Sequence, residues 1–118
     1  MMPIQYVSDM ASASLTRFDA GEGVNAAVRD LLVSQNHEAP MTAGLFRLEK
    51  GESLRYTYPY DEMKLVLDGE FVLLDETGSE VHAKAGDLLY FAKGSEITFS
   101  TPSYGLGYYV GQRGLDEA

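Results

Sequence analysis

Glycines divide the second half of this chain into short segments of similar length. From Gly69 to Gly94 they recur every eight or nine residues, which leaves room for short strands but not for ordinary helices. The segments around them are rich in β-branched and aromatic residues, which favour strands. Short strands with turn residues at this spacing are typical of an antiparallel sandwich or barrel. We therefore predict strands over residues 63–67, 70–76, 80–84, 87–92, 96–100 and 105–111.

The dipeptide Asp68-Gly69 lies between two of these apolar runs. Asp-Gly is favoured in two-residue hairpin turns of type I′, because both central residues of that turn have a positive φ. The sequence thus predicts a hairpin at Asp68 and Gly69 that joins strand 63–67 to strand 70–76.

Two further strands are predicted just upstream. Residues 43–50 and 53–58 alternate between apolar and polar positions, and the second run places Leu54, Tyr56 and Tyr58 on one face. These two strands extend the β pattern toward the first half of the chain.

Residues 26–35 fit two patterns, since their apolar positions match a helical spacing but also allow a strand. The β pattern that follows favours the strand. No repeat, low-complexity tract or linker interrupts the chain, so we expect a single domain over residues 1–118. Its core is expected over about 43–111, with an arm of N-terminal strands over 1–42.

Charge and composition narrow the classes of partner. The 118 residues include 9 Lys and Arg but 18 Asp and Glu, a net charge of −9, and no cysteine. Such a field repels nucleic acids and anionic membranes, and without cysteine there is no disulfide framework or thiolate metal site. The chain has neither a signal-peptide pattern at its N-terminus nor an apolar run of about eighteen residues that could span a bilayer. We therefore expect a cytoplasmic protein with no nucleic-acid or membrane partner.

The run from Gly51 to Gly69 and the run from Gly86 to Thr101 resemble the two motifs of the cupin superfamily. The first cupin motif has a glycine, two histidines one residue apart, a glutamate and a closing glycine; the second has a glycine, a proline, another glycine and a third histidine. Glu62 with Gly69, and Gly86 with Gly94, match their spacing. The resemblance implies an all-β fold, the cupin jelly-roll barrel or double-stranded β-helix.

The histidine positions of those motifs are substituted. They fall on Tyr56, Tyr58 and Ile97, and the proline position falls on Ala92. One carboxylate and two phenols with a pKa of about 10 are poor substitutes for three imidazoles at neutral pH. The only two histidines, at positions 37 and 82, lie far apart in the sequence. We therefore expect no metal and no other cofactor.

Within the cupins, the runs TYPYDEMKLVLDGEF (57–71) and AKAGDLLYFAKGSEITFSTP (83–102) resemble the cupin domain of the EutQ type, ethanolamine-utilisation protein Q. The resemblance implies a role in bacterial ethanolamine catabolism and its microcompartment, with an acetate kinase activity attributed to the family. Members carry an additional N-terminal region that is absent from this sequence. The sequence lacks a phosphate-binding glycine loop followed by Lys and Ser or Thr, which speaks against a kinase.

If the barrel forms, alternation directs Glu62 and Lys64 inward, on the side of Tyr56 and Tyr58, and directs Asp61 outward. The desolvation of Glu62 must then be offset by tyrosine hydroxyls or by Lys64, or the carboxyl group must be protonated. Glu62 is the candidate for general acid or base chemistry; a purely structural pair is the alternative. Ligand binding is predicted at Tyr56, Tyr58, Tyr60, Glu62 and Lys64.

Three functions remain open. The first is binding of a small polar metabolite in the barrel. The second is an enzyme, either with acetate kinase activity or as an atypical metal-dependent cupin that uses Glu62. The third is a scaffold associated with a microcompartment.

An apolar row predicts how two copies could associate. If Met63, Leu65 and Leu67 face outward, with Phe71 and Leu73 across the predicted hairpin, the sheet surface is more apolar than an exposed face should be. A symmetric pair is the commonest oligomer. We therefore expect a homodimer.

Overall fold

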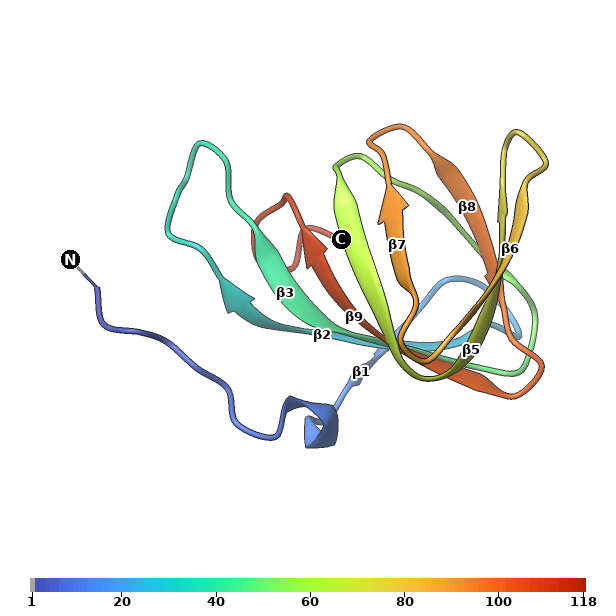
Figure 1. The fold of residues 1–118 in the computed structure, drawn as a ribbon, viewed down its shortest axis with the longest axis horizontal. Coiled ribbons are helices and arrows are strands. Elements are labelled where there is room, and N and C mark those ends of the chain that lie inside the picture. Colours follow the sequence, from blue (N-terminus) through green and yellow to red (C-terminus); the bar gives the residue numbers. More distant parts are fainter. Residues whose placement is uncertain (1) are drawn as a thin grey trace.

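Nine strands make up almost all the regular structure in the computed structural model, which describes residues 2–118 (Figure 1). Within these residues the one helical element is a 3₁₀ turn, η1 (Met10–Ser12), and no helix is long and apolar enough to cross a membrane. The strands are β1 (Thr16–Phe18), β2 (Asn25–Val33), β3 (Thr42–Glu49), β4 (Leu54–Thr57), β5 (Glu62–Asp75), β6 (Glu80–Lys84), β7 (Leu88–Phe91), β8 (Glu96–Ser100) and β9 (Tyr104–Gly111).

The strands form two antiparallel layers that share β5. The first half of β5 pairs with β7 and β9, and β9 continues through β3 and β2 to β1. The second half of β5 pairs with β6 and β8, and β8 pairs with β4. Figure 1 shows the chain closing around an interior between these layers. This is the all-β barrel that the cupin resemblance predicts.

Most of the predicted strands are confirmed. Residues 26–35, for which the sequence allows a helix or a strand, lie mainly in β2, where Ala26 is buried and Val28 packs against the core. The strands predicted over 43–50 and 53–58 are β3 and β4, with Leu54 and Tyr58 buried and Tyr56 half-buried.

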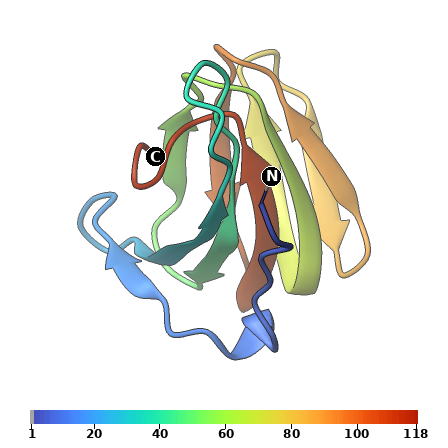
Figure 2. The same ribbon diagram turned by 90° about the vertical axis from the view of Figure 1, so that its left-hand side faces the viewer.

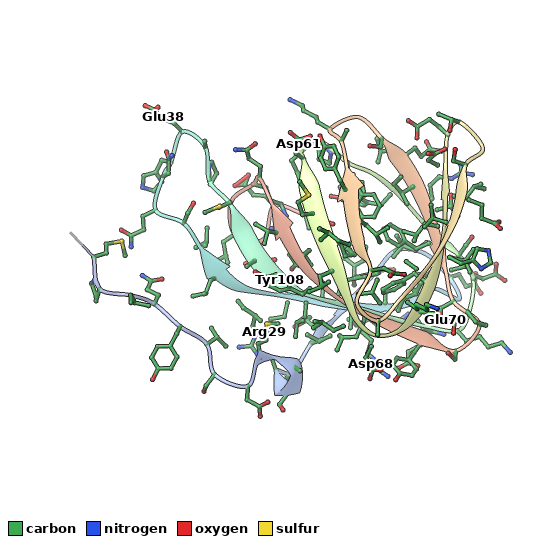
Figure 3. The ribbon with its side chains drawn as sticks, viewed as in Figure 1. Arg29, Glu38, Asp61, Asp68, Glu70 and Tyr108 are labelled. Carbon is green, nitrogen blue, oxygen red and sulfur yellow. The ribbon has the colours of Figure 1, made fainter. Side chains whose placement is uncertain are left out.

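The predicted hairpin at Asp68-Gly69 is wrong. Both residues lie inside β5, where the pairing with β9 shifts register between Val66 and Asp68. Gly69 has φ +67°, but Asp68 does not have the positive φ that a type I′ turn requires. The dipeptide forms a bulge instead, and the strand bends there from one layer into the other. Figure 3 shows Asp68 and Glu70 at this bend and Asp61 at the opposite end of the same half-strand.

The bulge changes which positions of β5 face inward. Before it, the inward residues are Glu62, Lys64 and Val66; after it, they are Phe71 and Leu73, which are 0% and 4% exposed. The extra residue of a bulge shifts the two-residue alternation by one position. The prediction that Phe71 and Leu73 share an outer face with Met63 is therefore wrong, because those two side chains belong to the core.

Aromatic rings fill the space between the layers. Phe46 stacks on Phe71 with ring centroids 5.9 Å apart, and Phe99 meets Phe46, Phe71 and Phe91 edge-on at 5.6–6.3 Å. Such contacts are favourable geometries for aromatic pairs. These rings are part of the buried core between the two layers.

The N-terminal segment extends away from the barrel and then crosses the outer side of the larger layer (Figures 1 and 2). Arg29 Nη1 of β2 donates a hydrogen bond of 3.1 Å to the carbonyl oxygen of Ser14. Leu45, on the outer face beside Arg29, is nevertheless only 1% exposed. This part of the outer face is therefore covered.

We predict that Gly69→Ala destabilises the fold by about 1–3 kcal/mol more than Gly78→Ala. Both glycines have a positive φ, but a Cβ at Gly69 would collide with the backbone carbonyl of Tyr104, whereas nothing lies within 4 Å of a Cβ at Gly78. Urea unfolding of the two variants measures the difference. Equal losses would show that the contact at the bulge does not constrain β5.

Candidate functional site

A cavity of about 50 Å³ lies inside the barrel. All five residues predicted to bind a ligand line it: Tyr56, Tyr58, Tyr60, Glu62 and Lys64. Tyr109 and Arg113 line it as well, and so does the exposed Ala118, so the cavity reaches the surface on that side.

Strand alternation positions the predicted residues. Tyr56 lies in β4, and Tyr58 and Tyr60 lie in the segment that follows this strand. Glu62 and Lys64 lie at the start of β5. Asp61 points outward, as predicted: its carboxylate accepts hydrogen bonds from Tyr90 Oη at 3.1 Å and from the Lys93 amide at 2.8 Å (Figure 3). Asp61 therefore does not form a carboxylate pair with Glu62.

Glu62 contacts both groups that can compensate for its burial, a tyrosine hydroxyl and the Lys64 amine. Its Oε2 accepts a hydrogen bond of 3.0 Å from Tyr58 Oη and lies 3.3 Å from Lys64 Nζ, and Glu62 and Lys64 are each only 4% exposed. Burial, reinforced by the neighbouring Glu62 carboxylate, raises the pKa of Tyr58 well above its usual value. Tyr58 therefore stays protonated and donates to Glu62.

The other two tyrosines form a hydroxyl pair at the wall of the pocket. Tyr56 Oη and Tyr60 Oη lie 3.1 Å apart. Burial and this hydrogen bond raise the pKa of Tyr60. The ring of Tyr58 packs edge-on against Tyr56 at 4.7 Å and against Tyr60 at 5.8 Å. The three rings thus fix one another, and the Tyr60 hydroxyl remains neutral.

A second buried ion pair, which the sequence analysis did not find, lies in the same pocket. The Arg113 guanidinium group donates two hydrogen bonds to the Asp30 carboxylate, with N–O distances of 2.8 and 2.9 Å. Both side chains are at most 5% exposed. Tyr109 Oη also donates to Asp30. Burial alone would raise the pKa of Asp30, but the hydrogen bonds from Arg113 and Tyr109 outweigh it and lower that pKa.

Glycines make room for these side chains. Asp30, Gly44, Tyr109 and Lys64 lie opposite one another on four neighbouring strands. A Cβ at Gly44 would collide with the Tyr109 hydroxyl that reaches Asp30, and a Cβ at Gly107 would come within 3.1 Å of the Lys64 side chain. Small residues on the inner face therefore leave the space that the two ion pairs occupy.

One polar atom of the site has no partner among residues 2–118. Arg113 Nε is buried and makes no hydrogen bond, although both terminal nitrogens of its guanidinium group are bonded. Leaving a buried donor unsatisfied costs roughly 1–3 kcal/mol. A hydrogen-bond acceptor that reaches this atom would recover that cost.

The sequence contains a signal for the inward positions of Tyr109 and Asp30, but none for Arg113. Alternation along 105–111 places Tyr109 on the same face as three glycines, and Asp30 is two residues beyond the inward Val28. Arg113 lies beyond the end of β9, where strand alternation no longer applies. Only the folded chain brings Arg113 to Asp30.

The residues at the cupin ligand positions do not fit a metal ion. Tyr56 and Ile97 face each other across β4 and β8, as the aligned motifs imply, but neither is an imidazole. No three His, Cys, Asp or Glu side chains within residues 2–118 are grouped so that they could hold a metal. The one carboxylate, Glu62, is already engaged by Lys64 and Tyr58.

We predict that Asp30→Asn lowers the free energy of unfolding at neutral pH by roughly 3 kcal/mol or more, because it leaves the Arg113 charge buried without a counter-charge. The folded-state pKa of Asp30 lies below the unfolded value of about 3.9, so this stabilisation is present above that pH. It is lost as the pH falls through the folded-state pKa. The unfolding free energy of the wild type should therefore fall more than that of Asp30→Asn on acidification.

Denaturant unfolding at a series of pH values measures both effects. The matched control is Glu49→Gln, which breaks the pair of Glu49 with Arg47, whose side chains are 51% and 39% exposed. That variant should change stability by less than about 1 kcal/mol. An Asp30→Asn effect as small as that of the control would contradict the role assigned to the buried pair.

Comparison with known proteins identifies relatives of this arrangement. The family model described as ethanolamine utilisation protein EutQ matches residues 2–112. The protein named acetate kinase EutQ from Salmonella typhimurium is 36% identical over 97 residues, which are 82% of this chain and 41% of that protein. Its namesake from Clostridioides difficile is 30% identical over 94 residues, 80% of this chain and 59% of that protein. The chain thus spans about two to three fifths of the length of these relatives.

Solved structures agree with the family match. The EutQ protein of Clostridium difficile superposes with a TM-score of 0.77 at 26% identity, over 88% of this chain and 83% of that one. A crystal structure of EutQ from Salmonella typhimurium gives 0.76 at 35% identity, over 88% and 82%. The cupin domain of Cnp3 from Schizosaccharomyces pombe, at 12% identity, shares the fold alone, with a TM-score of 0.70 over 92% and 72%. The chain therefore has the cupin fold and belongs to the family of the ethanolamine utilisation protein EutQ.

Proposed function

We propose that this chain binds a small polar metabolite inside its barrel, as part of bacterial ethanolamine or related carbon metabolism. The observation that carries the proposal is the buried Arg113 Nε, a donor without a partner on a side chain that lines the cavity. The tyrosine hydroxyls and the Glu62 carboxylate add further hydrogen-bonding groups to the same wall. A pocket with apolar rings and a few convergent polar groups is the usual form of a small-molecule site.

The size of the cavity limits the ligand. By the same measure of cavity volume, a single water molecule needs about 10–15 Å³. A cavity of about 50 Å³ therefore accommodates a molecule of only a few non-hydrogen atoms. The two ion pairs leave the pocket without net charge. Both features support a small molecule that is recognised by hydrogen bonds more than by its charge.

The names of the relatives support a second candidate, acetate kinase activity. An acetate-sized molecule fits the cavity, whereas a nucleotide is far too large for it. Any nucleotide would have to bind outside the barrel, and the matched relatives extend well beyond the region that this chain covers. A scaffold role is the third candidate.

A thermal-shift series with acetate, ethanolamine and acetamide, each with and without magnesium and ATP, separates the three candidates. Under the first proposal at least one small molecule raises the melting temperature without nucleotide, since a ligand at a hundred times its Kd contributes about 2.7 kcal/mol. Tyr60→Phe, which removes a pocket hydroxyl, should reduce that shift. The control Tyr6→Phe removes a hydroxyl from a residue that is 81% exposed and lies outside the pocket, and it should not.

The other outcomes are equally informative. A shift that requires magnesium and ATP would favour the kinase. No shift with any of the three molecules would contradict the proposed binding of such metabolites and favour the scaffold.

We also propose that the chain forms a homodimer through the outer face of the larger layer. On this face Met63 pairs with Tyr90 and Leu65 pairs with Leu88, and Val110 and Tyr108 continue the two rows on β9. Leu88, Tyr90 and Met63 are 70%, 57% and 51% exposed. Contact with a second copy would remove this apolar surface from water.

Light scattering coupled to size-exclusion chromatography measures the oligomeric state. We expect the wild type to elute with the mass of two chains and Leu88→Glu with the mass of one. Val81→Glu is the matched control, because Val81 is 46% exposed but lies on β6, away from this face. A wild-type monomer, or equal effects of the two substitutions, would contradict the proposed interface.

A further inference from the structure

Lys64 is placed unlike the other lysines of the chain. Lys50, Lys84 and Lys93 are exposed, whereas Lys64 points from the first half of β5 into the barrel and is 4% exposed. That half-strand runs between β7 and β9 (Figure 1), and the side chain lines the cavity. The Lys64 amine is thus the one lysine amine of the described residues that a molecule in the pocket can meet.

The surroundings of this amine are mostly aromatic. Nζ lies 4.4 Å from the ring centre of Phe46, 5.1 Å from that of Phe99 and 5.6 Å from that of Tyr109. Its polar partner is Glu62, at 3.3 Å. An ammonium group has three donors, and the ring faces compensate only partly for the water that those donors lose.

Burial therefore lowers the pKa of Lys64, and the Glu62 carboxylate opposes this effect without cancelling it. A lysine in an apolar site with a lowered pKa has a larger fraction of neutral amine near physiological pH. The neutral amine is the nucleophilic form of the side chain.

A group that can carry protons, the Glu62 carboxylate, lies beside the Lys64 amine. Glu62 Oε2 contacts both Lys64 Nζ, at 3.3 Å, and Tyr58 Oη, at 3.0 Å. A carboxylate in this position can take a proton from the ammonium group and later return it, while the hydrogen bond from Tyr58 holds the carboxylate oxygen in place. Amine, carboxylate and phenol thus form a connected set at the wall of the cavity.

We propose that the Lys64 amine condenses reversibly with a small aldehyde or ketone in this pocket to form an imine. The inference rests on the proposed binding function and names its ligand class as short carbonyl compounds. The amine nitrogen forms a bond to the carbonyl carbon, giving a carbinolamine once a proton has moved from nitrogen to oxygen. The carbinolamine then loses its hydroxyl group as water, using the proton that Glu62 took from the ammonium group, and the iminium nitrogen returns a proton to Glu62 to leave the imine. No electrons are exchanged with any other reactant.

The remaining polar groups suit such a ligand. A carbonyl oxygen is a hydrogen-bond acceptor, which is what the unpartnered Arg113 Nε lacks. A carbonyl compound has no formal charge, in keeping with two ion pairs that already balance each other. The cavity volume of about 50 Å³ restricts the ligand to a few non-hydrogen atoms.

Reductive trapping with propionaldehyde and cyanoborohydride tests the proposal on the intact chain. Cyanoborohydride reduces an imine to a stable secondary amine, which peptide mass spectrometry then locates. We expect Lys64 to be alkylated on the order of tenfold faster than Lys50, Lys84 and Lys93, because the pocket orients the aldehyde against the amine. Unfolding the protein in urea should abolish this preference.

The comparison among lysines is made within the wild type, so the result does not depend on a variant that folds. Lys64→Arg, or Lys64→Met if the arginine variant fails to fold, should retain only the slow labelling of the three exposed lysines. Labelling of Lys64 no faster than that of the exposed lysines in folded protein would overturn the inference. If a small molecule still stabilises the protein in the thermal-shift series, the proposed binding function survives that failure; if neither effect is seen, both fail.

Discussion

The bulge in β5 is the constraint on which the rest of the structure depends. A single strand of this length belongs to both layers, and it can do so only because one extra residue at Asp68 and Gly69 bends it and shifts its alternation. Before the bend the inward positions carry Glu62 and Lys64; beyond it they carry Phe71 and Leu73. Polar pocket and apolar core are thus two stretches of the same inner face.

The pocket contains four buried charged side chains and still has an open cavity. Each buried ion would destabilise the fold if it stood alone, so the structure sets Glu62 against Lys64 and Asp30 against Arg113. Glycines on β3 and β9 keep the walls thin enough to hold these long side chains. The Arg113 Nε remains unsatisfied after all these contacts.

Local sequence patterns predicted most of the fold and five residues of the site. Regular glycines and two-residue alternation located the strands, and alternation together with the cupin resemblance placed Glu62 and Lys64 inside. The failure at Asp68-Gly69 has a physical reason: the dipeptide permits a hairpin or a bulge, and only pairing with β9, which is formed by residues more than thirty positions later, decides between them. The Asp30–Arg113 pair was out of reach for the same reason, since it joins distant segments of the chain and Arg113 lies outside any strand.

The balance of charge within the barrel has a consequence for how molecules approach it. Because the four buried charges sum to zero, the net charge of −9 resides on the rest of the chain, and its field extends into solvent. At physiological ionic strength this field decays over about 8 Å. Small anions are therefore depleted near the molecular surface relative to bulk solution, while uncharged molecules arrive at their bulk concentration. The acidic exterior therefore disfavours the approach of anions, and this effect weakens with added salt. The interior, whose four buried charges cancel, has no such effect.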